Sequence, residues 1–381
     1  MGIISKIFNR MRSPHINYQP LIEVRVFKDA ILHNLHEYQK KYPKVKFAPV
    51  LKSNAYGHGL VEVAKILDKE DTAFFMVDSF YEALILRRAD IKTKILILGY
   101  CRPKQLLENT LGNVSFGIMD LEVLKNLAAK AKKNINIHLK IDTGMHRQGI
   151  LLAQVEEAIR LIKSNKNIFL EGVCSHFADA DSQDQEFTKA QIVEWNKAVK
   201  IFKQNFPEIA YYHFANTAGT FYSESIDANV CKAGIGLYGI NTSPFTEMNL
   251  KPVMEVASII SSIKNIPAGD KVGYNITYQA KHAMRVATVP VGYNEGVDRR
   301  LSNKGGYKVA GIFCPLAGRV SMNITTIDVT DVPNVKLEDE VIVISHNRTD
   351  ANSVENIAKM CGCIPYEVLV HLPSNLRRVV M

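Results

Sequence analysis

The stretch LKSNAYGHG, residues 51–59, places one lysine directly after an apolar run and follows it with a tyrosine, a histidine and two glycines. A lysine amine that is desolvated and close to other cations loses its proton more readily, so it can attack a carbonyl or act as a base. A lysine that ends an apolar run can also simply extend to the surface. Whether Lys52 does chemistry therefore depends on which other residues lie near it.

Other apolar runs of the chain are followed by residues that could hold a phosphate or a reactive carbonyl. They are Lys140, Asp142, Arg147, Ser175, His176, Asn216, Thr217, Lys232, Gly234 and Ile235. Cations and hydroxyls suit an anionic ligand, and glycine lets the main chain approach it closely. Taken alone, His176 would more often be a structural histidine, and its place after an apolar run is what favours function.

Eight short apolar runs must position these residues, and from Val45 onward they alternate with helix-period stretches. The runs are VKFAPVLK, AFFMVDS, KILILGY, VSFGIMD, INIHLKID, LEGVCSHF, YYHFANT and NVCKAGIG. Eight such units, with strands buried on both faces, predict a parallel (β/α)8 barrel, and a doubly wound open sheet is the alternative. Because the carboxyl ends of barrel strands face the active site, we expect the residues named above to meet there.

A change of composition near Leu250 predicts a second domain. The helical stretches disappear, and β-rich segments with Gly and Pro between them take over, which is typical of a mainly antiparallel β domain. A helical region, SVENIAKM and YEVLVHL, closes it. We therefore predict an N-terminal extension over residues 1–20, a barrel over 21–248 and a mainly β domain over 249–381, and the run Leu21 to Val26 could belong to either domain.

Composition narrows the classes of function. The chain has 381 residues and a formal net charge of +9, and its basic residues are scattered along predicted helices rather than gathered in a nucleic-acid stripe. No run approaches the ~20 apolar residues that a membrane helix needs. The six cysteines show no zinc or redox spacing and look like reduced thiols. We therefore expect a cytoplasmic protein without a metal, a membrane span or a nucleic-acid partner.

An ordered set of motifs resembles the alanine racemases, the fold-type III pyridoxal-phosphate enzymes that interconvert L- and D-alanine. Matching segments run from residue 51 to residue 369: LKSNAYGHG, LKIDTGMHRQG, GVCSHFADAD, FANTAG, KAGIGLYG, VGYNITY, VPVGYNEG, GRVSMN and YEVL. The first motif alone would be only suggestive, whereas the whole set in this order is specific. The resemblance implies pyridoxal 5'-phosphate as cofactor, a small amino acid as substrate and D-alanine for peptidoglycan as product.

The resemblance also implies a role for two bases. Lys52 would anchor the cofactor through a Schiff base and act as one base, and Tyr274 would be the second base on the opposite face. A phenol with an ordinary pKa near ~10 is a poor base at neutral pH unless its phenolate is stabilised. In the family, Tyr274 and Met322 reach the pocket of the partner subunit, so a homodimer with shared sites is implied.

The remaining expected site residues also come from the resemblance. For the cofactor they are Tyr56, Arg147, His176, Asn216, Thr217, Lys232, Gly234, Ile235 and Tyr366. For the substrate they are Arg147, Met322 and Tyr293. Lys140 occupies the position at which many members carry a carbamate, and an ordinary amine paired with a carboxylate is the alternative.

The chain departs from the family pattern at several positions. Lys232 replaces the arginine beneath the cofactor ring and keeps its charge without its planar fork. Asn323 replaces the aspartate after Met322, and GYNEG replaces the usual alanine-aspartate pair. A serine or broad-specificity racemase is therefore an alternative, because pocket residues change discrimination by only a few kcal/mol. A fold-type III decarboxylase and a non-catalytic cofactor-binding protein are weaker alternatives.

Overall fold

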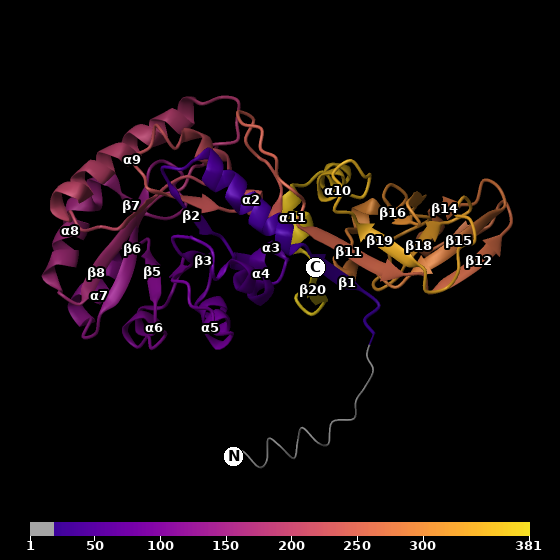
Figure 1. The fold of residues 1–381 in the computed structure, drawn as a ribbon, viewed down its shortest axis with the longest axis horizontal. Coiled ribbons are helices and arrows are strands. Elements are labelled where there is room, and N and C mark those ends of the chain that lie inside the picture. Colours follow the sequence, from indigo (N-terminus) through magenta and orange to yellow (C-terminus); the bar gives the residue numbers. More distant parts are fainter. Residues whose placement is uncertain (1–18) are drawn as a thin grey trace, which may run out of the picture.

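The computed structural model describes residues 19–381, which form a barrel lobe and a β-rich lobe joined side by side (Figure 1). The predicted N-terminal extension over residues 1–20 lies outside the described residues, apart from Gln19 and Pro20. Within 19–381, no helix combines the length and the apolar character that a membrane crossing requires.

Eight parallel strands within residues 19–381 form the barrel, in the spatial order β2-β10-β9-β8-β6-β5-β4-β3. Their bounds are β2 (Lys46–Pro49), β3 (Phe75–Val77), β4 (Ile95–Ile97), β5 (Val114–Ile118), β6 (Ile135–Asp142), β8 (Ile168–Cys174), β9 (Tyr211–His213) and β10 (Val230–Ala233). A parallel bridge between Val50 and Met76 joins the two ends of this order. The predicted barrel is therefore confirmed as nearly closed, and the open-sheet alternative is wrong.

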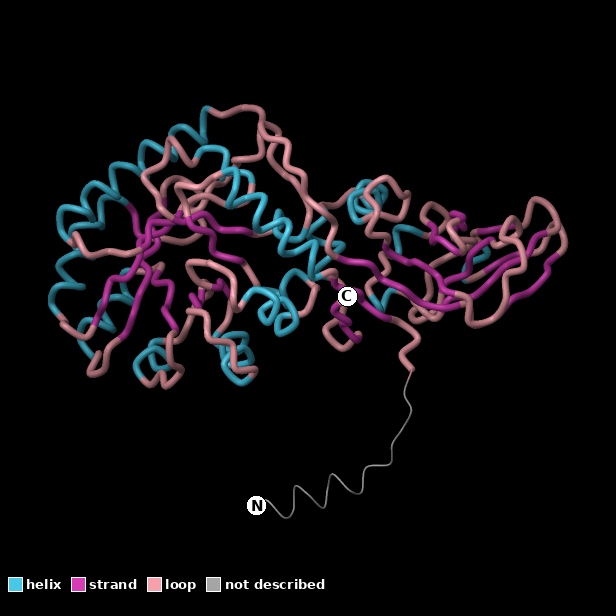
Figure 2. Tube along the Cα trace, viewed as in Figure 1, coloured by secondary structure: helices cyan, strands magenta, loops and turns pink. Residues whose placement is uncertain are grey.

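Helices surround the strands on the outside, as the cyan ring around the magenta strands in Figure 2 shows. They are α2 (Lys28–Lys41), α4 (Leu60–Leu67), α5 (Phe80–Arg88), α6 (Pro103–Leu107), α7 (Leu121–Lys130), α8 (Val155–Ser164) and α9 (Glu186–Asn205). The segment α3 (Lys52–Tyr56) is instead a left-handed turn that follows β2. Short elements complete the lobe: β7 (Ile150–Leu151) and the 3-10 turns η1 (Leu152–Gln154), η2 (Ala218–Tyr222) and η3 (Ile235–Tyr238). The strands are apolar on both faces because helices cover one side and barrel side chains fill the other.

The second lobe is mainly antiparallel β structure. Its strands are β11 (Met254–Ile259), β12 (Ser262–Ile266), β13 (Lys271–Val272), β14 (Tyr278–Gln279), β15 (Met284–Val289), β16 (Gly306–Val309), β17 (Ile312–Pro315), β18 (Thr325–Asp328), β19 (Glu340–Ile344) and β20 (Arg377–Val380). Between them lie η4 (Tyr274–Ile276), η5 (Tyr293–Glu295), η6 (Arg299–Leu301), α10 (Val354–Cys361) and α11 (Pro365–Val370). The predicted helical region is present, but it does not close the chain, because β20 follows it.

The strand β1 (Glu23–Val26) belongs to the second lobe, which the sequence left open. It pairs antiparallel with β11 and parallel with β20, so it lies in the sheet of the second lobe although it precedes the first barrel helix. The long sheet has the order β17-β16-β19-β11-β1-β20. Apart from this strand, we keep the proposed division at residues 248 and 249, which falls between η3 and β11.

The two lobes meet at the turn that carries Lys52. Helix α11 packs against α3, and a side chain on Gly57 would collide with the backbone of Leu369, 2.1 Å from its carbonyl oxygen. Arg378 on β20 donates to the carbonyl oxygen of Gly57 at 2.9 Å. The second lobe therefore helps to hold the shape of this turn.

Candidate active site

The residues after Lys52 have an unusual backbone. Ser53, Asn54, Ala55 and Tyr56 have φ angles of 56°, 56°, 52° and 51°, which places four successive non-glycine residues in the left-handed region. Each such residue costs about 1–2 kcal/mol relative to a right-handed turn. Strain of this kind persists only where the surroundings over-determine it, and it gathers at functional sites. The turn is therefore evidence for function that does not depend on motif matching.

A carboxylate on α5 holds this turn. Glu82 accepts hydrogen bonds from the amides of Ser53 at 2.7 Å and Asn54 at 3.4 Å through one oxygen, and from the amides of Asp78 and Ser79 through the other. Sequence reasoning missed Glu82, although the Ser79-x-x-Glu82 capping box gave a signal that it begins a helix. The additional contact to the lysine turn depends on the tertiary fold.

Hydroxyl groups and a close main chain gather at the start of η3. A side chain on Gly234 would lie 3.4 Å from the Tyr56 hydroxyl and 3.5 Å from the Thr217 hydroxyl. The amide of Gly236 donates to the same Thr217 hydroxyl at 3.2 Å. Tyr366 on α11 joins the group, with its ring centroid 5.9 Å from that of Tyr56. The Tyr56 and Thr217 hydroxyls beside this glycine, with the Tyr366 ring next to Tyr56, form a hydroxyl cradle that suits a phosphate.

A buried cation lies two residues before the glycine of this cradle. Lys232 is the third residue of β10 and is only 6% exposed, and its ammonium donates to the carbonyl oxygen of Ser175 at 2.5 Å. The pKa of Lys232 is lowered to about 7, chiefly by burial; the charges of Lys140 and Arg147 act in the same direction, while Cys174 and Cys231 oppose the shift. The amine at this position can therefore change its charge near neutral pH.

The electrostatic character of the site is positive. Burial lowers the pKa of His176 well below its ordinary value, and Lys232, Arg147, Lys140 and Lys52 add to that effect. The pKa of Lys140 is also lowered, by burial and by the charges of Arg147 and Lys52. A concentration of cations beside a hydroxyl cradle fits an anionic cofactor such as pyridoxal phosphate.

The other barrel residues expected at the site have more peripheral surroundings. Asn216 accepts from the amide of Gly219 at 2.8 Å, so its side chain supports the turn after β9. Arg147 is exposed and lines an open cleft of about 780 Å³ together with Tyr100 and Asp142. Lys52 itself is 40% exposed, and its amine lies 4.0 Å from Asp78.

Besides Tyr366, three expected site residues lie on the second lobe, and all three are exposed in the single chain. Tyr274 and Met322 are 68% and 56% exposed, and Tyr293 is also exposed. Tyr274 lies in the connection between β13 and β14, and Figure 1 shows β14 at the end of the second lobe, away from the barrel. Either these residues do not act in the site, or they act in that of another chain.

Two positions that depart from the family pattern, Asn323 and the GYNEG segment, contact each other in the structure. Asn323 donates to the carboxylate of Glu295 at 2.6 Å, and the same carboxylate accepts from Asn294 and from the amide of Gly292. An aspartate at position 323 would set two carboxylates against each other. The amide of Tyr293 also donates to Ser321, so the loops that carry Tyr293 and Met322 are joined.

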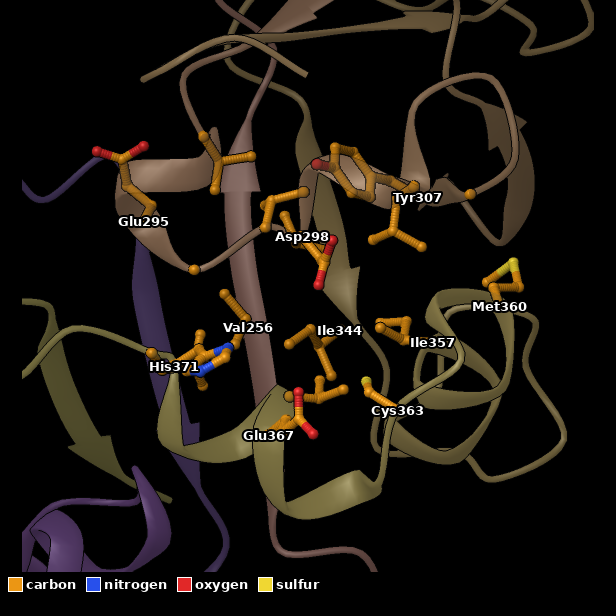
Figure 3. Close-up of a pocket in the computed structure, with 18 of the residues that line it drawn as sticks. Val256, Glu295, Asp298, Tyr307, Ile344, Ile357, Met360, Cys363, Glu367 and His371 are labelled. Carbon is orange, nitrogen blue, oxygen red and sulfur yellow. The ribbon is translucent and has the colours of Figure 1, made fainter. Parts of the chain in front are cut away.

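An enclosed apolar pocket lies elsewhere, between the long sheet of the second lobe and helices α10 and α11 (Figure 3). Its lining includes Val256, Tyr307, Ile344 and Ile357. The cavity measures about 30 Å³, which has room for little more than water. It is a packing gap of the second lobe and not a site for an amino acid.

Comparison with protein families covers both lobes. The model described as alanine racemase, N-terminal domain, matches residues 26–242, and the model described as alanine racemase, C-terminal domain, matches residues 253–380.

Individual relatives extend over nearly the whole chain. Alanine racemase 1 of Caldanaerobacter subterraneus subsp. tengcongensis is 36% identical over 365 residues, which are 93% of this chain and 94% of the relative. The solved structure of alanine racemase from Clostridium difficile 630 has a TM-score of 0.88 at 30% identity, covering 96% and 97% of the two chains. The structure of alanine racemase from Bacillus anthracis with bound L-Ala-P has a TM-score of 0.87 at 29% identity, covering 96% of each.

Proposed function

The chain belongs to the alanine racemase family, and on that premise we propose that it interconverts L-alanine and D-alanine with Lys52 and Tyr274 as its two bases. The predicted family, the isomerase class and the dependence on pyridoxal phosphate are confirmed. The observation that carries the proposal for this chain is the strained turn after Lys52, which supplies Tyr56 to the hydroxyl cradle, at the end of the barrel where the buried Lys232 also lies.

The residues present fit the cofactor. Its phosphate would be held by Tyr56, Thr217, Tyr366 and the amides near Gly234 and Ile235. Lys52 would hold its aldehyde, and Lys232 would lie beneath its ring, beside His176. When bound, pyridoxal phosphate supplies the electron-withdrawing ring that makes the alpha proton of an amino acid acidic. Arg147 would attract the carboxylate of the substrate, with Lys140 beside it, and Asn216 would support the turn that carries Thr217.

Inversion of one carbon needs two bases on opposite faces. The Lys52 amine can remove or return the alpha proton on one face. Tyr274 of the partner subunit would serve the other face, since the Tyr274 of the same chain lies on the far lobe. The cations around His176 would stabilise a phenolate brought to them. Met322 of the partner subunit would present its amide to the substrate carboxylate, and Tyr293 would narrow the entrance.

This mechanism requires a homodimer with shared sites. Supporting it, the second lobe exposes several large apolar side chains, which is typical of a surface that a partner covers. They are Tyr274, Ile276, Tyr293, Met322 and Ile324. A monomer would lack its second base.

The proposed setting is the cytoplasm, where the product would supply D-alanine for peptidoglycan. All six cysteines are free thiols, as a reducing compartment favours. A serine or broad-specificity racemase is the second candidate, because Asn323 and Glu295 change the loops that carry Met322 and Tyr293. Fractionation of cells would test the location.

The test of function is direct. Purified protein is supplied with pyridoxal phosphate and L-alanine, and D-alanine is followed with a D-amino-acid oxidase. We expect the same final mixture from either enantiomer. L-serine and L-lysine at equal concentration serve as competitors, and faster turnover of either one would favour the second candidate. Release of carbon dioxide without D-alanine would favour the decarboxylase.

A further inference from the structure

A carboxylate of the second lobe ties together the two loops that carry Tyr293 and Met322. Glu295 is the last residue of η5 and only 9% exposed. One of its oxygens, Oε1, accepts from the side-chain amides of Asn294 at 2.9 Å and Asn323 at 2.6 Å. The other, Oε2, accepts from the main-chain amide of Gly292 at 2.9 Å. Figure 3 shows this carboxylate directed away from the apolar pocket.

The main chains of the two loops also meet. The amide of Tyr293 donates to the carbonyl oxygen of Ser321 at 3.0 Å, and the amide of Asn294 donates to that of Met322 at 2.9 Å. Gly292 permits the close approach, because a side chain there would lie 2.2 Å from the Ser321 oxygen and 2.4 Å from the Met322 oxygen. We call the contacts between residues 292–295 and residues 321–323 the clasp.

The clasp fixes the direction of the Met322 amide. A peptide unit is planar and trans, so its C=O and N–H groups point in opposite directions. The carbonyl of Ser321 faces η5, and the N–H of Met322 belongs to the same peptide unit, so it points away from η5. An N–H held in one direction can donate to a carboxylate, which only accepts.

The side-chain part of the clasp depends on positions at which this chain departs from the family pattern. Asparagine at position 323 replaces an aspartate, and asparagine at position 294 replaces an alanine. Neither aspartate nor alanine has a side-chain N–H that could donate to Glu295. Two of the three hydrogen bonds to the Glu295 carboxylate therefore come from substituted positions.

We propose that Glu295 and Asn323 are positioning residues that hold the Met322 amide toward the carboxylate of the substrate. Neither side chain is assigned to the reacting atoms, so the pair sets the affinity for the amino acid and not the rate of proton transfer. An interaction made equally with substrate and transition state changes KM and leaves kcat unchanged. This consequence rests on the proposed function through the role of Met322, whereas the clasp itself does not.

The first experiment measures the clasp without any reaction. Hydrogen exchange of the full-length, cofactor-loaded protein is followed by mass spectrometry in the peptide that covers residues 290–298. Asn323 is exposed, so Asn323→Ala leaves the core intact. We expect the amides of Tyr293 and Asn294 to exchange about fivefold faster in this variant, because one hydrogen bond that closes the clasp is lost.

Asn265→Ala is the matched control for that comparison. Asn265 is an exposed asparagine of β12 in the same lobe, and it belongs to neither loop of the clasp. Exchange of residues 290–298 should be the same in this variant as in wild-type protein. Unchanged exchange in Asn323→Ala would overturn the clasp.

The second experiment separates positioning from support of the fold. Racemisation of L-alanine by Asn323→Ala should show KM raised about fivefold and kcat within about twofold of wild type. Asn265→Ala should keep the wild-type values of both. A structural support alone would lower stability without moving KM, so an unchanged KM in Asn323→Ala overturns the positioning role. An equal fall of kcat and kcat/KM overturns it as well.

Asn323→Asp adds a readout in pH. At low pH a protonated carboxyl can donate to its neighbour, whereas at higher pH two charged carboxylates repel each other. The ratio of its KM to the wild-type KM should therefore rise with pH. Wild type is the reference at each pH, since it has the same Asp298, Glu367 and His371 around the pocket that Glu295 borders. A flat ratio would contradict the contact between positions 295 and 323.

The double variant Glu295→Gln with Asn323→Asp is the rescue. It restores one side-chain N–H and one carboxylate between the two positions, so the pH dependence of the ratio should disappear. Persistence of that dependence would place its cause outside the clasp and overturn the proposal.

The two levels of the inference fail separately. Faster exchange in Asn323→Ala of a chain that does not racemise alanine would overturn the proposed function and support the clasp. Unchanged exchange in an active racemase would overturn the clasp alone.

Discussion

At the scale of single residues, the site combines a lysine on a strained turn with a second lysine buried beneath it. Lys52 is exposed enough to react, whereas Lys232 is almost fully buried and hydrogen bonded to Ser175. Two lysines in one site thus have different environments and different expected roles. Each role can be tested by itself.

Lys52 should be the residue that binds the cofactor covalently. Borohydride reduction of the cofactor-loaded protein, followed by proteolysis and mass spectrometry, should place the modification on the peptide that contains Lys52. The neighbouring amines of Lys140 and Lys232 are built-in controls, since both lie in the same positive site. A modification on either of them would remove Lys52 from this role.

Lys232 should make stability depend on pH. Its pKa is about 7 in the folded chain against 10.5 for an ordinary lysine, so between these values the unfolded chain binds more protons. Stability of the cofactor-free protein should therefore rise with pH across this window, by at most about 1.4 kcal/mol per pH unit. Urea unfolding at a series of pH values measures it.

Lys232→Met is the comparison for that series. Methionine keeps an unbranched side chain but cannot titrate, so the rise attributable to Lys232 should disappear from the variant. Parallel curves for the two proteins between pH 7 and 10.5 would show that Lys232 keeps its proton throughout this range, against the lowered pKa.

At the scale of elements, the turn after Lys52 depends on its neighbours. The left-handed conformation is held from α5 by Glu82 and from the second lobe by Arg378 and the backbone of Leu369. A turn of this kind stores strain that its supports must offset. Losing a support should therefore loosen the lysine as well as destabilise the fold.

Glu82→Ala tests this dependence. The change removes a charged acceptor from several backbone amides, so we expect a loss of about 2 kcal/mol in the free energy of unfolding and weaker binding of pyridoxal phosphate. Urea unfolding and cofactor titration measure the two effects. Glu122→Ala is the control, because Glu122 is an exposed residue of α7 whose carboxylate pairs with Lys125 at the surface. Wild-type cofactor affinity in Glu82→Ala would mean that the turn needs no such support.

At the scale of the whole molecule, the two lobes place Lys52 and Tyr274 apart, although the proposed reaction needs them together. Figure 1 shows the barrel and the far end of the second lobe at opposite sides of the chain. The exposed apolar side chains near Tyr274 are consistent with a surface that meets a second copy. Reconstitution from two defective chains can test this arrangement.

Lys52→Ala and Tyr274→Phe should each be nearly inactive alone, and Tyr274→Phe should still bind the cofactor. In a dimer with shared sites, a mixed pair contains one site with both defects and one with none. Random mixing after dissociation should therefore restore roughly a quarter of wild-type racemisation. No recovery in a sample shown to contain mixed dimers would place both bases in one chain, or remove Tyr274 from the mechanism.

The sequence by itself determined the barrel, the family and most of the residues around the lysine. Buried strands appear as apolar runs, and in a barrel their carboxyl ends converge, so local patterns are enough to bring Lys52, Thr217 and Lys232 to one end. The Tyr56 and Thr217 hydroxyls of the cradle follow from the same rule, whereas Tyr366 comes from α11 of the second lobe. These features depend on the hydrophobic period of each segment and on the order of the segments along the chain, and both can be read from the sequence.

Tertiary structure alone decided the features that depend on pairing between distant segments. The pairing of β1 with β11, the contact of Glu82 with the turn, the contact of Asn323 with Glu295 and the contact of His138 with His213 all join residues far apart in sequence. A bulge of one residue turns Glu171 toward His138, and no local period encodes where it falls. Which side chains face one another across a barrel depends on register, and register is settled only when the strands pair.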